Sequence, residues 1–185
     1  LSKLLSSPIY FGTSSQSQRS RKATASRRYI TRDAIYWVPL IMITMGVRPE
    51  EILQATVADV IRRDGILCLF IGDEEDSMLK NEQSRRVLPI PQILLELGFR
   101  EWIVARKKAG ETWLFPEIQP DKNHGRRSQI FGDRLRNLLR TLKLHSERED
   151  IYAMRRTLSS KLMQLGIDTG TRQKILGHLE GTTID

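Results

Sequence analysis

The last fifth of the chain, from about residue 150 onward, carries the pattern that most constrains the fold. Apolar residues recur there at helical spacing, so one stripe of a helix can be buried; they are Ile151, Met154, Leu158, Leu162 and Leu165. Gly166 is expected to close this helix. A second short helix should run from about Thr171 to Leu176 and stop at Gly177, because glycine commonly follows a helix C-terminus.

A polar face of the first of these helices carries Tyr152, Arg155 and Arg156, and His178 directly follows Gly177. Basic side chains on one helix face, together with a histidine at a helix exit, indicate a place for an anionic group. A solvated basic helix face is the plain alternative. These residues alone do not decide between the two.

The composition favours a polyanionic partner. Lys and Arg number 30 against 22 acidic residues, a net charge of +8, and 185 residues suffice for one domain with a sizeable core. Binding to nucleic acid should then weaken as salt is added. The single cysteine, Cys68, excludes an intrachain disulfide and lies in an apolar run, where a buried core residue is expected.

Other features bear on the setting of the protein and on its chemistry. No apolar stretch is long enough to span a bilayer and no signal peptide is visible, so we expect a cytoplasmic protein. The first residue is Leu rather than Met, which suggests a piece of a longer chain. The sequence has no phosphate-binding glycine loop, zinc-type Cys/His spacing or Gly-x-Ser-x-Gly motif, and we expect no metal or other cofactor.

The order of the elements predicts a mainly α fold with a small antiparallel β-sheet, of the α+β class. Residues 1–30 are rich in Ser, Arg and Lys and are predicted to form an arm or linker, and residues 31–185 form one domain. A helix over 32–45 is expected to begin at Thr31 as N-cap, to kink or split at Pro39 and to end at Gly46.

Further along, residues 57–61 and 66–71 should form a hairpin around Asp64-Gly65, and two more short strands should flank residues 81–84. An amphipathic helix over 92–108, with an interruption at Gly98, and a later helix capped by Ser128 complete the pattern.

The segment Gly-Val-Arg-Pro-Glu-Glu is the second candidate for chemistry. Pro49 suits the first position of a helix, so Arg48 lies at a helix N-terminus, where free N–H groups favour anions. In the alternative interpretation, Glu51 only caps the helix and Arg48 is a surface residue.

Taken together, Arg-x-x-Glu at 48–51, Ala-Met-Arg-Arg-Thr-Leu at 153–158 and Ile-Leu-Gly-His at 175–178 resemble the boxes of tyrosine recombinases, the phage-type integrases. Arg155 and His178 match the Arg and His of the C-terminal box. Tyr152 stands where the family has its first His. The family's nucleophilic Tyr, nine residues after the second His, would fall two residues beyond Asp185. The absence of this Tyr has three explanations: a truncated chain, a disordered tail, or a chain that lacks the nucleophile.

The resemblance implies a recombinase catalytic domain that cuts and rejoins double-stranded DNA through a 3′-phosphotyrosyl intermediate, without metal or ATP. In it Arg48, supported by Glu51, and Arg155 would hold the phosphate, and His178 would add a donor. Lys80, in a segment similar to the family's β-hairpin, would protonate the leaving group. Tyr152 would donate a neutral hydrogen bond. Further DNA contacts are expected from Arg85, Arg86, Arg126, Arg127 and Arg156, with one of Arg85 and Arg86 facing DNA and the other solvated.

The resemblance also implies homo-tetramers on DNA that exchange C-terminal segments, acting at the prokaryotic nucleoid. As it stands, the chain should bind DNA and form no covalent adduct. A catalytically degenerate, integrase-derived DNA-binding protein is the alternative, and Tyr152 gives it weight. An unrelated basic helical protein is a third.

Overall fold

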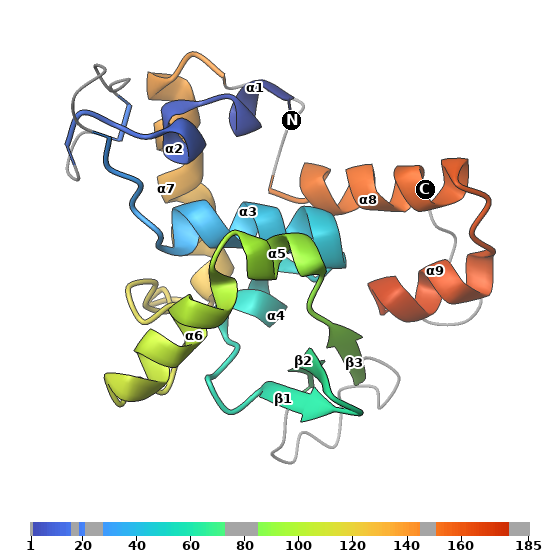
Figure 1. Cartoon of the computed structure of the whole chain (residues 1–185). Helices are drawn as coiled ribbons and strands as arrows, with labels where there is room; N and C mark the ends of the chain where they lie inside the picture. The colour runs from blue at the N-terminus through green and yellow to red at the C-terminus, as the bar shows by residue number, and fades with distance from the viewer. Residues whose placement is uncertain (1, 16–18, 21–27, 73–84, 145–150, 178–185) are drawn as a thin grey trace.

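The computed structural model describes residues 2–15, 19–20, 28–72, 85–144 and 151–177 of the chain. These residues form a helical body with a small antiparallel sheet at one edge (Figure 1), which confirms the predicted α+β class. The helices are α1 (Ser2–Leu5), α2 (Pro8–Phe11), α3 (Ala34–Met45), α4 (Pro49–Leu53), α5 (Gln92–Glu96), α6 (Phe99–Lys108), α7 (Arg127–Thr141), α8 (Ala153–Gln164) and α9 (Thr169–Leu176). The strands are β1 (Val60–Arg63), β2 (Ile66–Ile71) and β3 (Arg86–Pro89).

Helix α3 lies in the middle of the fold, where α2, α4, α7 and α8 pack against it (Figure 1). Its side chains are apolar on every side and most are buried, as expected for a helix surrounded by others. The helix continues through Pro39 without splitting, although the proline removes one backbone hydrogen bond. The predicted N-cap, Thr31, is wrong: Asp33 takes that position, and its carboxylate accepts from the Tyr36 N–H at 3.3 Å.

The sheet has the order β1-β2-β3, with both pairings antiparallel. Asp64 and Gly65 turn the first hairpin with φ values of 49° and 79°, the left-handed region that an Asp-Gly turn requires. The first strand begins later than the predicted residue 57, because the Val57 N–H donates instead to the Thr112 carbonyl at 2.9 Å. The predicted strand before Asn81 lies outside the described residues. Cys68 is buried in β2, as predicted.

Glycines divide the helices where the sequence predicted. The 92–108 helix is interrupted at Gly98, whose φ is 92°, and becomes α5 and α6. Gly46 and Gly177 end α3 and α9 in the left-handed conformation. The predicted cap at Ser128 is wrong, because the N-cap of α7 is Arg126, two residues earlier. Glu50 of α4 accepts from the Arg127 and Ser128 N–H groups at 3.0 and 2.8 Å.

Helix α8 packs on α3 mainly through its first half, where Met154 is buried. Met163 and Leu165, near its end, are 57% and 75% exposed, so the predicted apolar stripe does not stay buried as far as Leu165. The turn after α8 then leads into α9, which packs against α8 and β3 (Figure 1).

The prediction of an arm over residues 1–30 does not hold for residues 2–15. Helices α1 and α2 lie there, and Leu4 and Ile9 are buried in the common core. The Tyr10 hydroxyl donates to the Tyr36 carbonyl at 3.3 Å, which ties α2 to α3. Apolar residues at positions 4, 5, 9 and 10 outweigh the polar composition of the segment that follows.

Candidate active site

Arg48 is fixed by the short link between α3 and α4. Gly46 ends α3, Val47 is buried, and Arg48 is the N-cap of α4 with Pro49 at its first position, as predicted. The Glu51 carboxylate accepts from the Arg48 backbone N–H at 2.6 Å and from Nη1 of the Arg48 side chain at 2.7 Å. The side chain of Arg48 is thereby oriented, although 38% of it remains exposed.

Arg155 enters the same place from the first turn of α8. Its side chain is buried, and its guanidinium donates to the carbonyls of Gly46 and Leu176. Burial, followed by the positive charge of Arg48, lowers the pKa of Arg155 to about 10, so it stays protonated at neutral pH.

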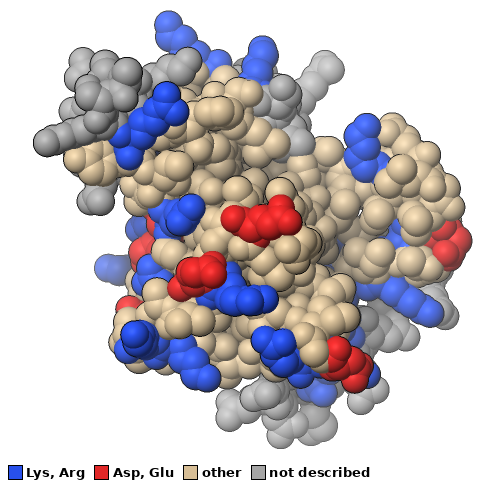
Figure 2. All heavy atoms as spheres, in the orientation of Figure 1, with Lys and Arg blue, Asp and Glu red and all other residues tan. Residues whose placement is uncertain are grey.

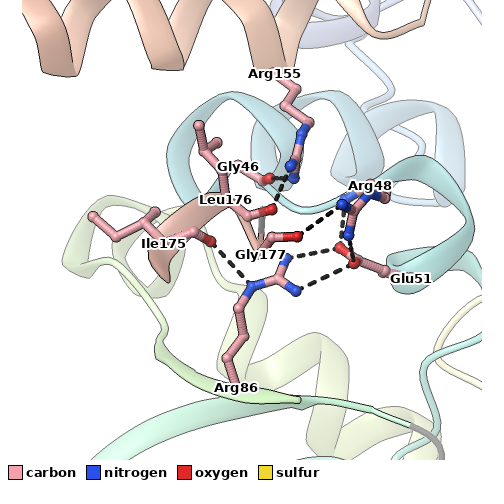
Figure 3. Close-up of polar contacts among 8 residues, drawn as sticks. All are labelled: Gly46, Arg48, Glu51, Arg86, Arg155, Ile175, Leu176 and Gly177. Carbon is pink, nitrogen blue, oxygen red and sulfur yellow. Dashed lines mark hydrogen bonds and ion pairs between the residues drawn. The ribbon is translucent and has the colours of Figure 1, made fainter. Parts of the chain in front are cut away.

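The end of α9 is where the two arginines meet (Figure 3). Arg48 donates through Nη2 to the Gly177 carbonyl at 2.8 Å, and Arg155 donates to the neighbouring Leu176 carbonyl. Residues more than a hundred positions apart are thus brought to adjacent peptide groups, immediately before His178 in the sequence. This arrangement needs α9 to lie close to α3, and Gly46 makes that possible. A Cβ added to Gly46 would lie only 2.8 Å from the Leu176 side chain and 2.9 Å from the Leu158 side chain.

Arg86 also belongs to this cluster. It lies at the start of β3 and donates to both oxygens of Glu51, from Nη1 at 3.2 Å and from Nη2 at 2.8 Å, and from Nε to the Ile175 carbonyl at 3.0 Å. Its side chain is 8% exposed, so its assignment as a DNA contact does not fit its position. Strand alternation could not show this, because the long side chain reaches from the sheet edge into α4 and α9.

Glu51 is shared by Arg48 and Arg86. Burial alone would raise the pKa of its carboxyl, but the hydrogen bonds and charge of Arg86, with the hydrogen bonds from Arg48, outweigh burial and hold the pKa below its ordinary value. Glu51 is therefore ionised at neutral pH, and it fixes two guanidinium groups rather than only capping a helix.

Arg127 is the second predicted DNA contact that does not fit. It is 7% exposed, lies 4.3 Å from the centre of the Trp113 ring and donates to the Ile118 carbonyl. Burial lowers the pKa of its guanidinium, which Glu50 partly opposes. Its neighbour Arg126 is exposed, so one residue of this predicted pair could reach a phosphate.

The remaining predicted site residues divide into two groups. Tyr152 is 44% exposed at the start of α8, and Arg85 and Arg156 are exposed. Lys80 and His178 lie outside the described residues, so their predicted roles stay predictions.

Figure 2 shows Lys and Arg side chains spread over one face rather than gathered in a single patch, so surface charge there does not mark a DNA-binding groove.

The described part of the chain contains neither a membrane-spanning helix nor a cluster of metal ligands. None of its helices is long and apolar enough to cross a membrane. Within the same residues, no group of three or more His, Cys, Asp or Glu side chains is arranged to hold a metal ion.

Comparison with known proteins identifies the family. The sequence model of the phage integrase family matches residues 17–185. No curated protein matches the chain significantly. Among solved structures, the XerH site-specific recombinase bound to its palindromic difH substrate has a TM-score of 0.61 at 19% identity, covering 96% of this chain and 44% of that chain.

The XerA recombinase gives a TM-score of 0.54 at 16% identity, over 78% of this chain and 47% of that one. The Tn1549 transposon integrase, in complex with transposon right-end DNA, gives 0.54 at 20% identity, over 77% and 50%. The matched part is thus half or less of each of these proteins, and the likeness establishes the tyrosine recombinase catalytic-domain fold. The predicted resemblance is confirmed: this chain belongs to the phage integrase family.

Proposed function

We propose that this chain is the catalytic domain of a site-specific DNA recombinase, which cuts and rejoins double-stranded DNA through a 3′-phosphotyrosyl intermediate. The observation that carries the proposal is the convergence of Arg48 and Arg155 at the end of α9. Membership of the phage integrase family supports it, as do structural neighbours that were solved on DNA.

The chemistry needs positive donors around one phosphate. A guanidinium carries five N–H groups in a planar fork that matches phosphate oxygens. The side chains of Arg48 and Arg155 each donate two hydrogen bonds within the protein. Further N–H groups therefore remain for non-bridging oxygens, where charge accumulates as the phosphorus becomes five-coordinate. Donors fixed before the reaction stabilise that charge without reorganising.

The other roles follow from the family resemblance. A tyrosine hydroxyl attacks the phosphorus, the bond to the 5′ oxygen breaks, and Lys80 gives that oxygen its proton. His178 adds a donor to the phosphate, and Tyr152 supplies a neutral hydrogen bond in place of the family's first His. The family resemblance implies a nucleophilic Tyr nine residues after His178, which is two residues after Asp185. Arg85, Arg126 and Arg156, which are exposed, would contact the DNA backbone.

Assembly and location belong to the same proposal. We place four copies on two duplexes, exchanging C-terminal segments, at the nucleoid of a prokaryotic cell. The net charge of +8 supports association with DNA. Tyr152 favours one alternative, a DNA-binding protein of the same family that no longer cuts, because a phenol hydroxyl transfers protons less readily at neutral pH than the imidazole of a histidine.

The test is formation of a covalent protein–DNA adduct. The complete product of the gene is incubated with nicked suicide duplexes made from the DNA that flanks the gene, and the products are separated on a denaturing gel. Wild-type protein should give the adduct. Arg48→Ala and Arg155→Ala should lose it, at a cost of at least about a hundredfold in rate, as for other preorganised donors.

Arg140→Ala is the matched control, because Arg140 is an exposed arginine of α7 outside the cluster. It should cleave like wild type. DNA binding by the wild-type protein with no adduct on any flanking sequence would favour the non-cutting alternative. Full activity of both cluster variants would refute the assigned roles.

A further inference from the structure

Three consecutive carbonyls at the end of α9 are held by three different arginines (Figure 3). The Ile175 carbonyl accepts from Arg86, the Leu176 carbonyl from Arg155 and the Gly177 carbonyl from Arg48. The last carbonyls of a helix have no partner within it and form the negative end of its dipole. Cations from β3, α8 and the start of α4 therefore cap α9 together.

The three arginines differ in their ion pairing. Arg86 forms a fork with both oxygens of Glu51, and the two side chains are 8% and 12% exposed. Arg48 shares Glu51, whereas Arg155 forms no ion pair within the described ranges. Three guanidinium groups against one carboxylate leave two positive charges for a phosphate. Without Arg86, Glu51 would neutralise Arg48 itself.

The turn after α9 is shaped to admit Arg86. Gly177 has φ 61°, and a Cβ added there would lie 2.8 Å from Cζ of Arg86 and closer still to Nη1. A side chain at 177 would thus displace the guanidinium that pairs with Glu51. Gly177 therefore leaves the space that the Arg86 guanidinium occupies. An Arg86 side chain that pointed from the edge of the sheet toward DNA would not need this space.

We propose that Arg86 is a positioning residue of the recombinase site, which orients Arg48 through Glu51 and fixes the end of α9, and that it contacts no DNA phosphate. This inference rests on the proposed function, and it makes Arg86 the residue that controls the geometry of the recombinase site. His178 is next in the sequence after the capped carbonyls. Loosening of α9 therefore changes the point from which the chain continues toward His178.

The experiment compares Arg86→Met and Arg86→Lys with Arg85→Met in the complete gene product. Arg85 is the adjacent residue of the same segment and is exposed, so it is the matched control. Three quantities are measured: the rate of adduct formation at saturating DNA, the salt dependence of DNA affinity, and hydrogen exchange of a peptide covering residues 169–177.

Arg86→Met should slow adduct formation at least tenfold, speed exchange in the 169–177 peptide, and leave the salt slope of binding unchanged. Arg85→Met should leave exchange near wild type and reduce the slope by about 0.9, the value for one phosphate contact. The control for the rate is Arg140→Ala, which should form the adduct like wild type. Arg86→Lys keeps the charge beside Glu51 but cannot reach Glu51 and Ile175 in the same way. It should restore slow hydrogen exchange in the 169–177 peptide more fully than the rate of adduct formation.

A slope reduced by about 0.9 in Arg86→Met would make Arg86 a phosphate contact and overturn the proposal. So would an unchanged rate together with unchanged exchange. If Arg86→Met does not fold, the Lys variant decides on the same three quantities. If wild type forms no adduct, the proposed function fails separately, and the salt slope and α9 exchange still decide whether Arg86 holds the cluster.

Discussion

Replacing Glu51 by Gln removes the one carboxylate of the arginine cluster and should destabilise the fold strongly. Glu51 accepts four hydrogen bonds, two from Arg48 and two from Arg86. The Arg48 side chain is 38% exposed, so its ion pair contributes at most about 1 kcal/mol. The Arg86 pair is buried, and breaking such a pair from one side costs about 3–5 kcal/mol, because a charge is left without a partner.

Gln keeps one acceptor oxygen but turns an NH₂ group toward guanidinium donors. We therefore expect Glu51→Gln to lose about 3 kcal/mol of unfolding free energy, the lower end of the range for a buried pair. For a chain of this size that corresponds to a melting temperature lower by about 6–12 °C. Urea unfolding and thermal melts followed by circular dichroism measure both quantities.

Asp133→Asn is the matched control, because Asp133 pairs with Arg136 at 2.6 Å while both side chains are 47% exposed. It should change stability by less than about 0.5 kcal/mol. A Glu51→Gln variant no less stable than Asp133→Asn would refute the reasoning, since the buried fork would then contribute nothing.

The same carboxylate has a pH signature. Because the pKa of Glu51 in the fold lies below its ordinary value of 4.5, its contribution is present above pH 4.5 and is lost as the pH falls further. The stability difference between wild type and Glu51→Gln should shrink below pH 4.5. A difference that stays constant down to pH 3 would contradict the assigned ionisation.

Three further substitutions test other parts of the structure. Gly177→Ala should lower the melting temperature and the adduct rate, because alanine is strained at φ 61° by about 1–2 kcal/mol and its Cβ meets Arg86. Arg126→Ala should reduce the salt slope of DNA binding by about 0.9, whereas Arg127→Met, at a buried site, should leave the slope unchanged and cost stability. Asp33→Ala should cost about 1 kcal/mol in urea unfolding, because it removes the N-cap of α3 and the ion pair with Arg19 at 2.5 Å.

The sequence predicted those features that depend on local chemistry. Gly46, Gly98 and Gly177 end or divide helices because a residue without Cβ adopts positive φ without strain. Pro49 placed Arg48 at a helix start, since its fixed φ and missing N–H suit that position. The two arginines of the family boxes could be paired because the family resemblance supplied their common target.

The wrong predictions concern side chains whose partners are distant in the sequence or better placed than the predicted ones. Thr31 and Ser128 are adequate caps locally, but the carboxylates of Asp33 and Glu50 bind the free N–H groups of α3 and α7. Glu50 comes from α4, so a search of the sequence around α7 could not find it. The sequence likewise gives no sign that Arg127 packs on the ring of Trp113, so it was predicted to be a charged loop residue.

The partners of the arginine cluster are the part of the site that no residue pattern could reveal. Bringing Arg155 out of water beside Arg48 is unfavourable, and the lowered pKa of Arg155 reflects both the burial and the repulsion. What offsets this are backbone carbonyls of Gly46, Leu176 and Gly177, which every residue type carries. The sequence specifies them indirectly, through two glycines: Gly46 lets α3 approach Leu176 closely, and Gly177 leaves room for the guanidinium group of Arg86. The positive charge left in the cluster then favours a phosphate, because an anion relieves a repulsion that the fold already sustains.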